Sequence, residues 1–245
     1  MKIGLGFLML VALAACTDDP SALAPVVEGP WHSMQPMPKR YRVQAGDTLY
    51  SIAFRYDQDY RRLAAMNHLH SPYVVKLGQF ISLKPPSSGP GTSFTPMLSL
   101  VPQPSRRQGS RLINYELHDT PAPKHSHWLW PTRGRIIADF APELGKKGID
   151  IAGSRNQTIR ATASGWVAYA GDGLPGYGNM ILIQHPHQVL SAYGYNARNL
   201  VHAGQSIRAG QAIAIMGTGP QHRYATHFEL RKAGKPINPK YFLQY

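Results

Sequence analysis

The sequence predicts two folded domains of different classes: a small α+β (βααβ) domain at residues 41–84 and a mainly β, antiparallel domain at residues 126–245, joined by a disordered linker. Two segments of helical spacing lie in the first range, between two short alternating runs. Short alternating runs separated by glycine-rich turns fill the second. Residues 85–125, between them, are rich in Pro and Ser and cannot bury a core. We therefore expect the two domains to move independently.

The N-terminus has the features of a lipoprotein export signal. The apolar run Ile3–Ala14 is shorter than the about 20 residues that span a bilayer as a helix, so residues 1–15 are a predicted signal peptide. It ends Leu13-Ala14-Ala15-Cys16, which resembles the lipobox of bacterial lipoproteins, and Cys16 is the only cysteine. A buried core cysteine is the alternative, but no apolar segment follows it. The resemblance implies lipidation at Cys16 and, because Thr17 rather than Asp follows, an outer-membrane anchor facing the periplasm.

The chain is strongly basic although few of its residues are charged. Its formal net charge is +13 at pH 7, at a charged fraction of 16%. A surplus of this size favours an anionic partner. Export to the cell envelope excludes nucleic acid, which leaves the carboxylates of peptidoglycan and acidic protein surfaces. A role in solubility alone is the alternative.

A flexible tether is predicted at residues 16–40, which contain several prolines and little periodicity. The βααβ unit then begins at Tyr41. Its predicted strands are Tyr41–Val43 and Gly78–Leu83, and its predicted helices are Thr48–Tyr56 and Asp59–Asn67. Asp47 and Asp59 are the expected helix caps, because a side-chain oxygen there can accept a hydrogen bond from a free amide of the first turn.

Motifs within residues 41–84 resemble the LysM family, among them Gly46-Asp47-Thr48-Leu49 and the run from Val75 to Ile81. The resemblance implies binding of glycans that contain N-acetylglucosamine, in a shallow groove between two loops. A glycine permits close backbone approach there, and a tyrosine ring can lie against a sugar face. The alternative is that the first loop serves only as a helix cap, although one residue can do both. The residues expected to bind glycan are Gly46, Asp47, Thr48, Pro72 and Tyr73.

The C-terminal domain is predicted to form short strands with turns such as Gly171-Asp172-Gly173 between them. Its length is sufficient for one hydrophobic core. The predicted strands are Ile136–Ala138, Thr158–Ala161, Gly165–Ala170, Met180–Gln184, Val189–Tyr193 and Gln211–Met216.

Phrases such as Gly148-Ile149-Asp150-Ile151-Ala152 and His227-Phe228-Glu229-Leu230-Arg231 resemble the LytM or lysostaphin-like metallopeptidase family. The resemblance implies an antiparallel domain of the duplicated-hybrid, or barrel-sandwich, type. In that family a His and an Asp separated by three residues bind zinc together with the second His of a His-x-His pair. The first His of that pair and a His after a Tyr-Ala step assist catalysis. The corresponding positions here carry Lys146, Asp150, His227, Ala225 and Tyr195.

These departures predict a site without catalysis. A catalytic zinc needs three protein ligands and an open position for water. Only Asp150 and His227 remain, and the Lys146 ammonium would repel a dication, so we expect no hydrolysis, no metal and no cofactor. We expect instead that Lys146 pairs with Asp150 and that the groove, with Tyr195 and Ala225, binds a partner. The last two are expected to set partner choice.

Other histidines could in principle complete the site. His185, His187 and His202 occur in turn-like sequences and are predicted to be surface or turn residues. His222 belongs to a loop that could fold toward the groove, which makes it the one candidate for repair of the site.

The combination of lipobox, LysM-like domain, Pro-rich linker and degenerate LytM-like domain resembles the lipoprotein activators of periplasmic N-acetylmuramoyl-L-alanine amidases. The resemblance implies a non-catalytic protein that binds peptidoglycan, relieves the autoinhibition of such an amidase and so promotes septal wall splitting in cell division. Two other functions stay open. One is an active zinc-dependent peptidoglycan endopeptidase, and the other is a passive tether that binds the wall.

Overall fold

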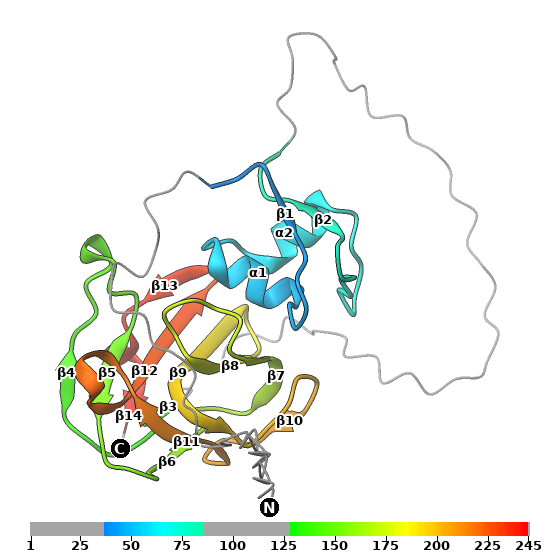
Figure 1. Cartoon of the computed structure of the whole chain (residues 1–245). Helices are drawn as coiled ribbons and strands as arrows, with labels where there is room; N and C mark the ends of the chain where they lie inside the picture. The colour runs from blue at the N-terminus through cyan, green and yellow to red at the C-terminus, as the bar shows by residue number, and fades with distance from the viewer. Residues whose placement is uncertain (1–36, 86–127, 245) are drawn as a thin grey trace, which may run out of the picture.

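A computed structural model describes residues 37–85 and 128–244 of the chain. Figure 1 shows two domains, with the N-terminal domain lying against one end of the C-terminal domain. The predictions at Cys16, for most of the tether and for nearly all of the linker lie outside the described residues. Residues 37–40 of the predicted tether are described, and Arg40 already begins a strand. Within the described ranges, no helix is both long and apolar enough to cross a membrane.

The N-terminal domain has the predicted βααβ order. Its elements are β1 (Arg40–Arg42), α1 (Leu49–Arg55), α2 (Tyr60–Met66) and β2 (Phe80–Ser82), and β1 pairs with β2 antiparallel.

The caps of the two helices differ from the prediction in one case. Thr48, not Asp47, is the N-cap of α1, because its side chain accepts from the Ser51 amide and the Ser51 hydroxyl accepts from the Thr48 amide. The Asp47 carboxylate instead accepts from the hydroxyl of Tyr41 at 2.7 Å. The predicted cap of α2, Asp59, is confirmed.

The C-terminal domain is built on one strongly bent antiparallel sheet. Its main path runs β10-β7-β8-β9-β11-β12-β5-β4, with β13 beside β12 and β6 beside β11. A further pairing joins β9 to β12, and a small parallel pair, β3 with β14, lies apart from the sheet. The strands are β3 (Trp128–Leu129), β4 (Ile136–Ala138), β5 (Ile149–Ala152), β6 (Thr158–Arg160), β7 (Gly165–Gly171), β8 (Asn179–Gln184), β9 (Val189–Asn199), β10 (Ser206–Ile207), β11 (Ala212–Thr218), β12 (Tyr224–Lys232), β13 (Lys235–Ile237) and β14 (Leu243–Gln244), and the 3-10 turns are η1 (Pro142–Leu144), η2 (Pro220–His222) and η3 (Pro239–Tyr241).

Strand β12 holds the domain together, because it pairs with β5, β9, β11 and β13. One of its faces is apolar and contributes Phe228 and Leu230, both fully buried, to the core. The opposite face carries His227, Glu229 and Arg231, which are also buried. β12 is not among the predicted strands, although Phe228 and Leu230 alternate with polar residues as in a half-buried strand; its polar face is buried rather than exposed.

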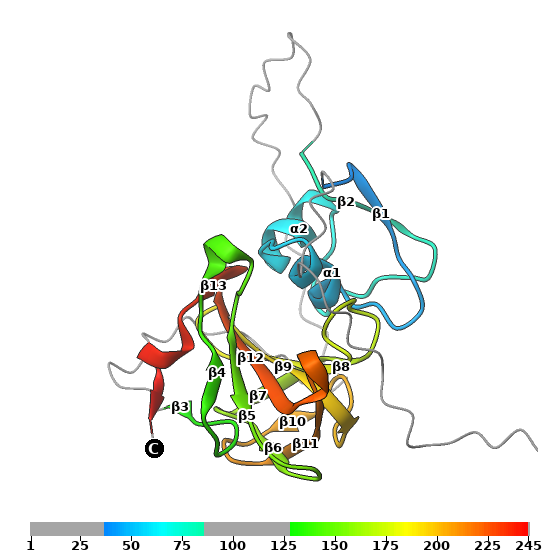
Figure 2. The same ribbon diagram turned by 60° about the vertical axis from the view of Figure 1, so that its left-hand side comes forward.

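The two domains share one hydrophobic cluster. Tyr50 and Phe54 of α1 pack with Tyr177 and with Leu182 of β8 in this cluster. Figure 2 shows the same contact from another side, with α1 facing the sheet. The expectation that the domains move independently is therefore wrong for the structure described, in which they are docked.

Candidate functional site

A groove opens beside β4, β5 and β12, bordered by the turn η2. Its volume is about 310 Å³. Four of the five residues predicted to form it do line it, namely Lys146, Asp150, Ala225 and His227. Gln221 and Arg223, which the sequence did not single out, line its rim.

The fifth predicted residue, Tyr195, lies under the groove rather than in its lining. Its side chain is buried, with 1% of its surface exposed. Its ring packs beside the imidazole of His227, with centroids 5.6 Å apart. Tyr195 also has a left-handed backbone, at φ 63°. It therefore shapes the groove from beneath.

Asp150 and His227 are joined to each other at the floor of the groove. The pairing of β5 with β12 places the two residues directly opposite. Nδ1 of His227 lies 2.6 Å from Oδ1 of Asp150. The predicted pair between Lys146 and Asp150 is wrong: among the described residues the ion-pair partner of Asp150 is His227, and Lys146 is exposed at the groove wall.

The second nitrogen of His227 is also held by a carboxylate. Nε2 lies 3.1 Å from Oε1 of Glu229, which accepts in addition from the hydroxyl of Tyr177 at 2.8 Å. Burial acts to lower the pKa of His227, but the hydrogen bonds to Asp150 and Glu229 outweigh it and raise the pKa to about 9. At neutral pH an imidazolium therefore lies between two carboxylates.

Glu229 is in turn held by Arg231, two residues further along the same face of β12. Nε and Nη2 of Arg231 each lie 2.8 Å from Oε2 of Glu229. Burial alone would raise the pKa of Glu229, but the charges of Arg231 and His227 lower it well below its ordinary value. Because burying an unpaired charge is costly, this close pairing is what allows Glu229 and Arg231 to be 1% exposed.

The row of charges continues into the N-terminal domain. Nη1 of Arg231 donates to Oδ1 of Asp57 at 2.7 Å and to the carbonyl of Phe54 at 3.0 Å. The ammonium of Lys147 donates to the other oxygen of Asp57. The resulting set of alternating charges, here called the charge row, consists of Asp150, His227, Glu229, Arg231, Asp57 and Lys147.

The sequence identified only the first two members of the charge row as site residues. The spacing of His227, Glu229 and Arg231, every second residue, was the available signal, because alternate residues of a strand share one face. No comparable signal pointed to Asp57, which lies 174 residues before Arg231 in the chain.

The remaining histidines do not complete the site. His222 is exposed on η2 and does not line the groove, although both of its neighbours do. His185 was predicted to be a surface or turn residue and is instead buried, between the carbonyl of Ser164 and the hydroxyl of Ser191. Burial lowers its pKa to about 4. In the part of the chain that the structure describes, no three His, Cys, Asp or Glu residues are grouped to hold a metal.

The predicted glycan-binding residues lie on two loops of the N-terminal domain. Gly46 and Pro72 are exposed, and Gly46 has φ 80°. Tyr73 is half-buried, with its ring 5.6 Å from that of Tyr60. Thr48 serves as a helix cap and the Asp47 carboxylate bonds within the domain, so glycan binding by these residues stays a prediction.

Comparisons with known proteins agree with both domains. Residues 41–84 match the LysM domain, and residues 145–239 match peptidase family M23. The predicted fold class is confirmed by these matches together with the mainly β antiparallel sheet.

Three relatives align with most of the chain. The chain is 36% identical to a lipoprotein NlpD/LppB homolog of Pseudomonas aeruginosa over 270 aligned residues, which cover 98% of this chain and 90% of that protein. It is 35% identical to the murein hydrolase activator NlpD of Escherichia coli K12, over 83% of this chain and 67% of that protein. It is 33% identical to an uncharacterized E. coli lipoprotein, YgeR, over 99% of this chain and 94% of that protein.

Proposed function

This chain belongs to the NlpD family of lipoproteins, and from that premise we propose that it activates a periplasmic N-acetylmuramoyl-L-alanine amidase without cleaving peptidoglycan itself. The LysM domain binds the glycan of the cell wall, and the groove of the M23 domain binds the amidase. Together they direct amidase activity to septal peptidoglycan in cell division. The chain is anchored through Cys16 to the outer membrane, on its periplasmic face; the name of a Histophilus somni relative, outer membrane antigenic lipoprotein B, supports this placement.

One observation carries the non-catalytic part of this proposal: both ring nitrogens of His227 are already held by carboxylates. To bind zinc, His227 would have to give up its hydrogen bond with Asp150 or its hydrogen bond with Glu229. The position of the third family ligand carries Lys146, which has no lone pair to offer while it is charged. The residues present therefore do not fit a catalytic zinc ion, and no step of the mechanism requires one.

The groove is instead suited to bind a protein segment. Asp150 and His227 neutralise each other at its floor, while Lys146 and Arg223 are exposed at its wall and rim. The surface that a partner meets is thus basic. An acidic or hydrogen-bonding segment of the amidase fits this surface better than a basic one.

Activation by binding is a shift between two forms of the amidase. The activator must bind the open amidase more tightly than the autoinhibited one, and each 1.4 kcal/mol of this preference changes their ratio about tenfold. A residue that lines the groove therefore contributes to activation only if it binds the open amidase more favourably than the autoinhibited amidase.

A dye-release assay on labelled sacculi tests this function. The soluble Cys16→Ala chain, a periplasmic amidase, and their mixture are compared at equal concentrations. Release by the mixture well above the sum of the two separate reactions supports activation. Release by the chain alone supports an endopeptidase, and sacculus binding without any increase in release supports a passive tether.

A further inference from the structure

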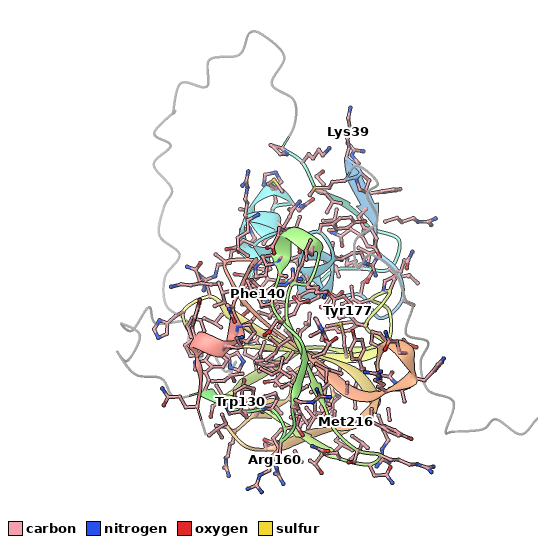
Figure 3. The ribbon with its side chains drawn as sticks, turned by 90° about the vertical axis from the view of Figure 1, so that its left-hand side faces the viewer. Lys39, Trp130, Phe140, Arg160, Tyr177 and Met216 are labelled. Carbon is pink, nitrogen blue, oxygen red and sulfur yellow. The ribbon has the colours of Figure 1, made fainter. Side chains whose placement is uncertain are left out.

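The LysM domain lies at one end of the M23 domain and contributes nothing to the lining of the groove. All residues that line the groove come from the M23 domain. The domain contact is made elsewhere, and Figure 3 places Tyr177 in the region where the LysM domain meets the sheet. There the ring of Phe54 packs against Tyr177 at 5.5 Å, and the Arg231 guanidinium lies 3.6 Å from the centre of the Phe54 ring.

One carboxylate of the LysM domain joins the two strand segments that border the groove. Oδ1 of Asp57 accepts from Arg231, on the strand that carries His227. Oδ2 of Asp57 accepts from Lys147, in the segment that leads into the strand carrying Asp150. Asp57 therefore ties together the same two strands that the Asp150–His227 pair joins at the groove floor.

The contact with Lys147 bears directly on the groove wall. Lys146 and Gly148 line the groove, whereas Lys147, between them, extends to Asp57 in the other domain. Successive side chains of an extended segment point to opposite sides. Fixing the side chain of Lys147 therefore fixes which way Lys146 and Gly148 face.

The surroundings of Asp57 shield these contacts from solvent. Arg231 is 1% exposed and Lys147 is 12% exposed, against 32% for Asp57, so solvent screens the ion pairs only weakly. Asp57 also has a left-handed backbone, at φ 53°, which aspartate and asparagine tolerate better than most residues. Replacing Asp57 by asparagine therefore removes the charge without straining the backbone.

We propose that Asp57 of the LysM domain is a positioning residue for the groove of the M23 domain, because it holds β12 and the segment before β5 in the arrangement that the partner binds. Asp57 does not contact the partner. The inference rests on the proposed function, since the partner is the amidase whose activation it affects. It also implies that the LysM domain contributes to activation apart from its binding to the wall.

The test uses the full chain as the soluble Cys16→Ala protein. Asp57→Asn removes the charge at constant size, and Lys147→Met breaks the same contact from the M23 side. The double variant completes a double-mutant cycle. Asp139→Asn and Lys240→Met are the matched controls, because Asp139 and Lys240 form an exposed ion pair at 2.9 Å within the M23 domain.

Three quantities are measured for each variant: the increase in amidase dye release, binding to sacculi, and hydrogen exchange of the backbone amides. We expect Asp57→Asn and Lys147→Met each to lower the activation at least tenfold. The double variant should activate as well as either single variant, because both substitutions break the same contact. Amide exchange should become faster at residues 146–152 and 224–231 but not in β8. Sacculus binding and both control variants should match the parent chain.

Normal activation by the Lys147→Met variant would overturn the inference. This holds even if Asp57→Asn fails to fold, because Lys147→Met leaves the LysM domain unchanged. Equal exchange rates in the groove strands of parent and variants would overturn it as well. If the parent chain itself does not activate the amidase, the proposed function fails. If the parent chain and the variants all activate the amidase equally, the proposed function stands and only the role of Asp57 is excluded.

Discussion

Tyr50 of the LysM domain and Trp166 of the M23 domain meet edge to face, with ring centroids 5.0 Å apart and planes inclined at 85°. Tyr50 belongs to α1 and Trp166 to β7, so the pair spans the domain boundary. Edge-to-face pairs contribute about 0.5–1.5 kcal/mol beyond the area that they bury. This aromatic contact and the ion pairs of Asp57 with Arg231 and Lys147 both cross the domain boundary and act together to dock the two domains.

Trp166→Ala should weaken this docking. We expect the two domains of the parent chain to unfold in one transition in urea, because they share a buried cluster. The substitution should lower the free energy of unfolding by about 2 kcal/mol, since it removes a half-buried aromatic ring. Tryptophan fluorescence and far-UV circular dichroism, followed together, should then show separate midpoints. Coincident, unshifted midpoints in the variant would show that the contact does not dock the domains.

Replacement of His227 by alanine should destabilise the M23 domain strongly. Asp150 and Glu229 would face each other without the cation between them, and removing one partner of a buried ion pair costs about 3–5 kcal/mol. Urea denaturation at pH 7 measures the loss. His202→Ala, at an exposed turn, is the control and should change stability by less than about 0.5 kcal/mol. Similar stability of the two variants would contradict the pairing described at the groove floor.

Stability should fall as the pH rises above neutrality. The pKa of His227 is about 9 in the folded chain, against its ordinary 6.5, so folding favours the protonated form. The resulting stabilisation is fully present below pH 6.5 and is lost as the pH rises through about 9. Each pKa unit between the folded and unfolded chain corresponds to about 1.4 kcal/mol of stability. The difference between about 9 and 6.5 therefore corresponds to about 3 kcal/mol. Urea midpoints between pH 6 and pH 10 measure it, and in His227→Gln the loss over this range should be much smaller.

The acid side of the stability profile should depend on His185. Burial lowers its pKa to about 4, so the folded chain holds this imidazole neutral while the unfolded chain protonates it near 6.5. Stability is therefore expected to fall as the pH drops from about 6.5 to about 4. Nuclear magnetic resonance titration of the His185 ring in the folded chain checks the assignment. A midpoint near 6.5 would be inconsistent with the buried environment.

Charge reversal at the groove wall should affect activation but not folding. Lys146 is exposed, so Lys146→Glu should change the unfolding free energy by less than about 0.5 kcal/mol. It should lower amidase activation at least tenfold, because it places a negative charge where an acidic or hydrogen-bonding segment binds. Arg160→Glu is the matched control, since Figure 3 shows Arg160 at the end of the M23 domain farthest from the LysM domain. Equal activation by the two variants would exclude this wall from the partner site.

The sequence was sufficient to predict most of the domain architecture, because that rests on local patterns. The βααβ order, the cap at Asp59 and the positions of six strands follow from spacing and turn residues within short windows. Strand β12 is absent from the predicted strands although residues 227–231 alternate polar and apolar side chains; the sequence could not show that its polar face is buried, because that burial depends on the distant residues Tyr177 and Asp57. The cap of α1 was assigned one residue too early because Asp47 and Thr48 are both good capping residues, and the structure uses threonine.

The groove was predictable only in part, because its arrangement depends on residues far apart in the chain. Lys146, Asp150, Ala225 and His227 were identified through the family motif and do line one groove. The pairing of Asp150 with His227 depends on the register of two strands 77 residues apart. The role of Asp57 depends on the docking of two domains across a long linker, for which the sequence has no local signal.

The most direct test of the central claim is mass spectrometry of the products released from purified sacculi. We predict that the chain alone releases nothing and that the mixture with the amidase releases stem peptides cut from muramic acid, leaving the cross-links between peptides intact. A fall in cross-links with the chain alone, reversed by a chelator, would contradict the account and show that the groove is catalytic.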